Sequence, residues 1–317
     1  MKKAFAALLT ALPIAAFAQA WPTKPVKIIV PYPPGGAVDV VTRKVAQKLS
    51  EQTGHPFIVE NKAGATGTIG CAQVAKSPAD GYTLLANDMT YSLLPHVFKT
   101  LPWDHEKDLV AVTTTMFAPY GLAVRADGPY KSLGDLIAAA KASPGKLNFG
   151  SGGSGTAPHF AAELLMLTTK TQLTHVPYKG AAEAMTGLIG GQVDLMLAST
   201  ASLLGQTKGG KARMLAISGE RRAAILPEVP TFAQAGLPDY GIMNFNGLWA
   251  PKDTPPATIA RIQAETAKAV AAADVKAFFE TQAGEPGGTP TAEFAKRVQD
   301  TTRLWGRVAE AAKVEKQ

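Results

Sequence analysis

The amino-acid sequence predicts an α/β protein of two lobes, in which two parallel-rich sheets are flanked by helices and hinged by two crossing segments. Three observations predict this fold class. The 317 residues amount to about two domains of chain. Short apolar and β-branched runs alternate with stretches of helical period, and the alternation restarts after Arg125. From Thr254 onward the pattern is helical, without strands for a further sheet.

The first alternation has a βαβαβ order. Gly54 follows the first helical stretch and predicts its end, because glycine readily adopts the left-handed conformation that stops helices. The predicted elements are a strand over residues 26–30, a helix over 38–52, a strand over 56–59, a helix over 68–76 and a strand over 82–86.

The second alternation begins with a helix whose start is marked by a capping box, Ser132 with Asp135 three residues on. The predicted elements are helices over residues 133–142, 158–168 and 181–189, and strands over 146–149, 173–177, 193–198 and 213–217.

The helical tail has Pro255 in a predicted first turn, and Thr289-Pro290 opens a final helix through Trp305. Because the tail has no sheet of its own, we expect it to pack back on the first half. The chain then crosses between lobes twice, through residues 119–124 and 245–250, and two crossings form a hinge. The prediction is lobe I from 21–122 and 247–317, lobe II from 123–246, and a ligand cleft between them.

Residues 1–20 have the pattern of a cleaved secretory signal peptide: Lys2 and Lys3, an apolar stretch over 4–17, and Ala-Gln-Ala before Trp21. A membrane anchor is the alternative, but it needs about 20 apolar residues. This stretch is shorter and is interrupted by Pro13. The mature protein is therefore expected outside the cytoplasm.

Composition excludes several classes of protein. Apolar residues make up 46% and charged residues 18%, which is ordinary for a globular chain. The single cysteine, Cys71, has no intrachain partner, and its place in an apolar stretch predicts a small core residue. The basic residues are scattered, so we expect no nucleic-acid partner. We also expect no metal, no cofactor and a monomeric protein.

The turn after the first strand, residues 31–39, is the first candidate site. Paired glycines and a helix N-terminus turn N–H groups toward one point, which is typical of an anion site. A tight turn that needs positive φ explains the motif equally well. Asp39 is expected to cap Gly36 rather than meet an anion. The candidate residues here are Tyr32, as a cleft wall, with Gly35, Gly36, Ala37 and Asp39.

The turn over residues 150–156 is the second candidate site, again between a strand and a helix. It formally matches G-x-G-x-x-G, but the acid expected about 20 residues later is missing. The Lys of a phosphate-binding loop and the G-x-S-x-G of a hydrolase are missing too. A neutral anion cradle remains. Its candidate residues are Ser151, Gly152, Gly153, Ser154, Gly155 and Thr156.

Three further features bear on the candidate site. The glycine-rich turn over residues 61–67 either lines the same cleft or is plain turn chemistry. His159 and His175 are isolated from a matching nucleophile and acid, so structural imidazoles are favoured. An exported hydrolase or isomerase using Ser151 or Ser154 with His159 is the alternative function.

Seven blocks of sequence carry a family resemblance, in order: PYPPGGAVDVVTR, VENKAGATGTIG, SPADGYTLL, FGSGGSGTAPHFAAELL, HVPYKGAAEAMTGLIGGQVDLML, EVPTFAQAGLP and NGLWAPKDTPP. Together the chain resembles the solute-binding proteins of tripartite tricarboxylate transporters, the Bug family. Ala63, Lys62, Thr66 and Gln234 depart from the residues usual in that family. These departures leave the identity of the ligand undetermined, but they do not affect the expected fold.

The resemblance implies a periplasmic binding protein of type II architecture that delivers a small mono- or dicarboxylate to a membrane permease. It implies that the loops matching residues 32–39 and 150–156 hold the carboxylate, largely through backbone groups and bridging waters. Thr90, Tyr178 and His159 complete the predicted ligand-binding set. A sensory receptor that presents its ligand to a membrane kinase is a further alternative.

Overall fold

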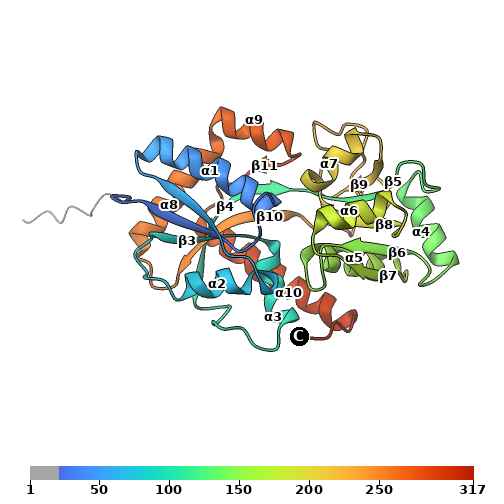
Figure 1. Ribbon diagram of the computed structural model, residues 1–317, viewed down its shortest axis with the longest axis horizontal. Coiled ribbons are helices and arrows are strands. Elements are labelled where there is room, and N and C mark those ends of the chain that lie inside the picture. The colour runs from blue at the N-terminus through green and yellow to red at the C-terminus, as the bar shows by residue number, and fades with distance from the viewer. Residues whose placement is uncertain (1–20) are drawn as a thin grey trace, which may run out of the picture.

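The computed structural model describes residues 21–317, so the predicted signal peptide lies outside the described residues. Two sheets lie at opposite ends of an elongated molecule, with helices on both faces of each (Figure 1). The strand order is β11-β4-β10-β3-β1-β2 in the first sheet and β7-β6-β8-β5-β9 in the second. The predicted two-lobed α/β fold class is confirmed.

The first sheet has a parallel core of β1 (Val26–Val30), β2 (Phe57–Asn61) and β3 (Thr83–Asp88). Its antiparallel members are β10 (Asn244–Pro251), which lies between β3 and β4 (Leu109–Ala118), and the short β11 (Glu285–Pro286) on the outer side of β4. The sheet is therefore mixed, although its core is parallel as expected.

Helices cover both faces of the first sheet because each has one apolar stripe. In α1 (Ala37–Thr53) the buried residues Val38, Val41, Val45 and Leu49 recur at helical spacing, and Gly54 ends the helix in the left-handed conformation with φ 72°, as predicted. The same core includes α8 (Pro256–Ala271) and α9 (Ala273–Thr281). The other face carries α2 (Thr68–Ala75), α3 (Leu94–Val97) and α10 (Thr291–Ala311) (Figure 1).

The second sheet has a parallel core of β6 (Asn148–Ser151), β7 (Thr174–Pro177) and β8 (Leu195–Ser199). β5 (Tyr120–Arg125) runs antiparallel between β8 and β9 (Ala212–Ile217). The helices are α4 (Leu133–Ala142), α5 (Ala157–Thr169), α6 (Ala181–Ile189) and α7 (Thr200–Lys208). The capping box predicted at the start of α4 is present, with Ser132 and Asp135 as its pair.

The chain passes between the sheets at two places. β4 of the first sheet ends at Ala118, and after Pro119 the chain continues as β5 of the second. It returns through residues 239–243 into β10. A strand that arrives from the other lobe enters its sheet from the opposite end, which explains why β5 and β10 are antiparallel to their neighbours.

Several elements differ from expectation. The sequence patterns missed β4 and α7, and the tail is not helical throughout, because β11 interrupts it and pairs with β4. α7 has the polar sequence TASLLGQTK, which carries little helical periodicity. The tail nevertheless packs on the first sheet, where Phe294 of α10 lies against Trp249 of β10 with ring centroids 4.9 Å apart. Within residues 21–317, no helix combines the length and apolar character needed to cross a membrane.

Candidate functional site

The candidate site lies where the carboxyl ends of the parallel strands of the two sheets are followed by helix N-termini, the usual ligand position in open α/β sheets. The turn from β1 into α1 belongs to the first sheet, and the turn from β6 into α5 belongs to the second. α1 begins on the side of its lobe that faces the other lobe (Figure 1). The lobes touch here: a Cβ built on Gly155 would lie 2.5 Å from Val97 Cγ1.

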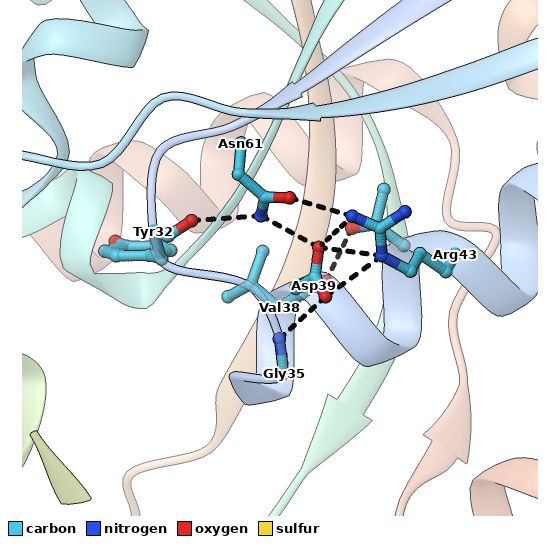
Figure 2. A network of polar contacts seen from close by, with 7 residues as sticks. Tyr32, Gly35, Val38, Asp39, Arg43 and Asn61 are labelled. Atoms are coloured by element: carbon cyan, nitrogen blue, oxygen red, sulfur yellow. Dashed lines mark hydrogen bonds and ion pairs between the residues drawn. The ribbon is translucent and has the colours of Figure 1, made fainter.

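Asp39 organises the first turn from inside (Figure 2). The Gly35 N–H donates to Asp39 Oδ2 at 2.9 Å, with Gly35 at φ 82°. Arg43 Nε donates to both carboxylate oxygens at 3.0 Å, and Asn61 Nδ2 donates to Oδ1 at 2.8 Å. Asp39 therefore binds the Gly35 amide rather than capping Gly36, which is the N-cap residue of α1 and has no side-chain cap.

This network neutralises the carboxylate. Burial raises the pKa of Asp39, but the hydrogen bonds from Arg43, the Gly35 amide and Asn61 outweigh it and hold that pKa below its ordinary value. Arg43 Nη2 also donates to Asn61 Oδ1 at 2.8 Å, and Asn61 Nδ2 donates to the Tyr32 carbonyl at 3.0 Å. The turn from β1 is thus tied to the end of β2, and the negative charge of Asp39 at the start of α1 is compensated by Arg43.

The first amides at this helix start are open. The N–H groups of Gly36, Ala37 and Val38 have no acceptor among the residues that the structure describes. Gly36 is exposed, and a Cβ added to it would meet only the Pro33 carbonyl, at 3.6 Å. Free N–H groups and the helix dipole together favour an anion at this point. The Gly35 amide is already bonded to Asp39. Gly36 and Ala37 are therefore the predicted ligand-binding residues whose N–H groups remain free for a ligand.

A second polar group follows β3. Tyr32 Oη donates to Asn87 Oδ1 at 2.7 Å and approaches Asp88 Oδ1 at 3.3 Å, while the Thr90 amide donates to the same Asp88 oxygen at 2.9 Å. Burial raises the pKa of Asp88, and burial together with the charge of Asp88 raises that of Tyr32. Thr90 is buried, so its amide serves the loop itself.

The second turn is held by contacts within itself. The Gly153 N–H donates to Ser151 Oγ at 3.2 Å, and the Gly155 N–H donates to His159 Nδ1 at 3.2 Å. Thr156 Oγ1 donates to the Gly153 carbonyl at 2.7 Å. Of the hydroxyls in this turn, that of the exposed Ser154 has no partner in the described part of the chain. The amides of Gly152 and Ser154 are likewise without an acceptor within residues 21–317.

Two histidines stack beneath this turn. The rings of His159 and His175 are 4.1 Å apart, and His175 Nε2 lies 2.7 Å from Ser151 Oγ. The Ser151 hydroxyl also lies 3.0 Å from the Gly153 carbonyl, so it bridges the turn and the His175 ring. Burial, with His159 nearby, lowers the pKa of His175 to about 4. His175 is therefore a neutral structural support for the turn.

This arrangement corrects the pairing assumed for a hydrolase. Ser151 is paired with His175 rather than His159, and it is fully buried. His159 instead accepts from Gly155 and lies 3.4 Å from Glu163.

A third helix start approaches the second turn. A Cβ built on Gly152 would lie 3.2 Å from the Ala181 nitrogen and 3.3 Å from Gly180, which precedes α6. Tyr178 donates its amide to the Ser151 carbonyl at 2.9 Å, but its hydroxyl points to Gln192 at 3.2 Å. The ring of Tyr178 covers Gly150 and Gly187, and this contact is core packing rather than a wall of the turn.

The structure thus brings the predicted residues together in two groups. Residues 32–39 share one network with Asn61, and residues 151–159 share another with His175. Sequence reasoning missed partners distant along the chain, and β-strand pairing was the signal that relates them: Asn61 pairs with Val30, and His175 with Phe149. The residues missed were Arg43, Asp88, Gly180 and Ala181, and Asn61 was named only as the first residue of the turn over residues 61–67. Within residues 21–317 no cluster of His, Cys, Asp and Glu has the makings of a metal site.

Comparison with known proteins adds to this geometry. The family model of the tripartite tricarboxylate transporter family receptor, TctC, matches residues 41–314. The chain belongs to this family. One relative is a UPF0065 protein of the tcbD-tcbE intergenic region in Pseudomonas sp. (strain P51), 37% identical over 291 residues, or 91% of this chain and 86% of the relative. The TctC resemblance expected from seven sequence blocks is confirmed.

Solved structures agree. The periplasmic binding protein BugD matches with TM-score 0.82 and 29% identity, covering 94% of this chain and 100% of that one. Rpa4515 of R. palustris with adipate matches with TM-score 0.86 and 30% identity, at 94% and 100% coverage. MatC of Rhodopseudomonas palustris with bound malate matches with TM-score 0.81 and 28% identity, at 91% and 99% coverage.

The family is one of transporter receptors, not enzymes, and its structural neighbour BugD is a periplasmic binding protein. This chain is accordingly a solute-binding receptor, and the alternative of an exported hydrolase or isomerase is not supported.

Proposed function

We propose that this TctC receptor binds a small mono- or dicarboxylate between its lobes and delivers it to the membrane permease of a tripartite tricarboxylate-type transporter. We place the mature protein in the periplasm. The signal peptide over residues 1–20 directs its export and is then cleaved. Two structural neighbours were solved with dicarboxylates, adipate and malate, which supports this class of ligand.

The observation that carries the proposal is the start of α1. The free N–H groups of Gly36, Ala37 and Val38 lie at the positive end of a 17-residue helix, while Asp39 is already neutralised by Arg43. A carboxylate bound there needs no buried arginine as counter-charge. Each charge-assisted hydrogen bond contributes about 1.5 to 3 kcal/mol. A few such bonds give about −8 kcal/mol, which is micromolar affinity.

The second turn completes the site when the lobes close. The free amides of Gly152 and Ser154 and the Ser154 hydroxyl would then reach the ligand from the other side. A ligand that contacts both lobes favours the closed form, because its affinity differs between the two states. Closure about the two crossings brings both lobe surfaces into register, and we propose that the permease recognises this form.

The test is calorimetric titration with a carboxylate panel that includes adipate and malate. Gly36→Val places a branched side chain over the α1 amides in a position with room for it, so the fold should persist while affinity falls roughly tenfold or more. The control is Gly205→Val in α7, where a Cβ meets nothing within 4 Å. Unchanged affinity in Gly36→Val, or consumption of a bound carboxylate by the wild type, would contradict the proposal.

A further inference from the structure

Two side-chain oxygens at the ends of β3 and β10, Asp88 Oδ2 and Asn246 Oδ1, have no hydrogen-bond partner among the described residues. Asp88 Oδ1 accepts from the Thr90 amide and approaches Tyr32 Oη, but Oδ2 has no partner within residues 21–317. Asn246 is 3% exposed, and its side chain makes no hydrogen bond to any described residue, leaving Oδ1 buried and unpaired. A buried polar atom such as Asn246 Oδ1 is rarely left unpaired, so it requires an explanation.

The two side chains share one face of the first sheet. Asp88 and Asn246 lie directly opposite in the antiparallel β3·β10 ladder, and such pairs project to the same side. Two positions further into the ladder, Ala86 pairs with Leu248, and both belong to the core that includes Val38 of α1. Asp88 and Asn246 are therefore on the face covered by α1, at the end of the sheet where α1 begins.

No cation compensates Asp88. Among the described residues, no Lys, Arg or His nitrogen lies within 4.0 Å of its carboxylate, in contrast to Asp39 with its Arg43. Asp88 is half-buried, so solvent reaches it only in part. A carboxylate accepts hydrogen bonds and donates none, whereas the Asn246 amide presents oxygen or nitrogen by rotating about its last torsion. The group that suits this place is a donor, and a positively charged donor suits it better than a neutral one.

We propose that the ligand of this receptor carries an ammonium or hydroxyl group near the carboxylate held by α1, and that Asp88 and Asn246 bind that group. The proposal rests on the proposed function, because it assumes a carboxylate at the α1 N-terminus. It narrows the ligand to amino- and hydroxycarboxylic acids, with the ammonium preferred because Asp88 brings an uncompensated charge. A plain dicarboxylate would instead leave Asp88 Oδ2 and Asn246 Oδ1 without a donor and place its own negative charge near Asp88.

Matched pairs of acids test the proposal by calorimetric titration. The pairs are propionate with alanine, succinate with aspartate, glutarate with glutamate, and adipate with 2-aminoadipate; malate serves as the hydroxyl form of succinate. In the pair that binds best, the amino acid should bind roughly tenfold to a hundredfold more tightly than the plain acid. If succinate and aspartate bind, the affinity for malate should lie between their two affinities.

Two variants locate the effect. Asp88→Asn should lower affinity for the amino acid roughly tenfold while leaving the plain acid equal or tighter. Asn246→Leu removes the amide at similar volume and should likewise lower the preference for the amino acid over the plain acid. The control Asp253→Asn changes an exposed aspartate that makes no hydrogen bond to a described residue and should behave as the wild type.

The outcomes separate the two proposals. If plain acids bind as tightly as amino and hydroxy acids, or if Asp88→Asn leaves their affinity ratio unchanged, this inference is wrong while carboxylate binding stands. If no acid of either kind binds the wild type, the proposed function fails and the inference fails with it.

Discussion

At the residue scale, the start of α1 depends on the placement of one carboxylate. Asp39 points back to the Gly35 amide and is held by Arg43 and Asn61 (Figure 2). Had Asp39 pointed toward Gly36 and Ala37, its charge would have occupied the amides proposed for the ligand. The spacing of Asp39 and Arg43, four residues apart on one helix, brings this pair together without help from the rest of the fold.

His175 gives a pH prediction at the same scale. Its pKa is lowered to about 4 in the folded protein, against 6.5 for an ordinary histidine. As the pH falls, the unfolded chain therefore binds a proton at this histidine before the folded protein does. The contribution of neutral His175 to stability is present above pH 6.5 and is lost as pH falls toward 4. Thermal unfolding from pH 7.5 to 4.5 should therefore show a smaller loss of Tm in His175→Gln than in the wild type. A His55→Gln control should follow the wild type, and parallel curves for His175→Gln would contradict the prediction.

At the scale of elements, β10 and α10 fit together because of one glycine. A Cβ on Gly247 would lie 2.8 Å from Phe294 Cε1 and 2.9 Å from the Thr113 carbonyl, so the ring of Phe294 rests directly on the strand backbone. The tail can reach the first sheet in this position because Gly247 has no side chain.

Gly247→Ala should therefore force α10 outward and destabilise the protein by about 1 to 3 kcal/mol, the usual cost of overpacking a core. Chemical denaturation measures the change in the free energy of unfolding. The matched control is Gly205→Ala in α7, which has open space around it and should gain up to about 1 kcal/mol from helix propensity. Equal effects in the two variants would refute the role given to Gly247.

At the scale of the whole molecule, the lobes touch beside the site as well as at the crossings. Phe160 of α5 packs edge-on against Trp305 of α10 with centroids 5.9 Å apart, and Gly155 lies against Val97 of α3. Tyr240 also donates its hydroxyl to the Ala161 carbonyl at 2.7 Å. Closure of the lobes must accommodate these contacts.

Gly155→Ala tests this contact. The added methyl would meet Val97 Cγ1 at 2.5 Å, and Gly155 is at φ 74°, so the variant should hold the lobes further apart and weaken carboxylate binding. Val97→Ala in the same chain should restore the part of the affinity lost to the clash, but not the part lost to backbone strain. Calorimetry gives the affinities and small-angle scattering the spread of the lobes. A Gly155→Ala variant of full affinity would contradict this account of closure.

The sequence by itself determined the fold class and most of the elements around the site. Helix starts and ends were predictable at Ser132 and Gly54 because capping depends on neighbours along the chain. Two predictions were wrong for different reasons. The helix α7 was missed because its apolar pattern is weak. The strand β11 was missed because it forms only where the tail pairs with β4, which is distant along the chain. The glycine-rich turns were likewise visible, since strands, turns and helix starts are local features.

Which groups in those turns remain free was decided by tertiary structure alone. Strand pairing brings Asn61 to Asp39, places His175 under Ser151 and sets Asn246 opposite Asp88. Each of these contacts joins residues at least 22 positions apart, so no local pattern specifies them. A hydrogen-bonding group has a limited number of partners, and only the folded chain determines which groups are already satisfied and which are left for a ligand.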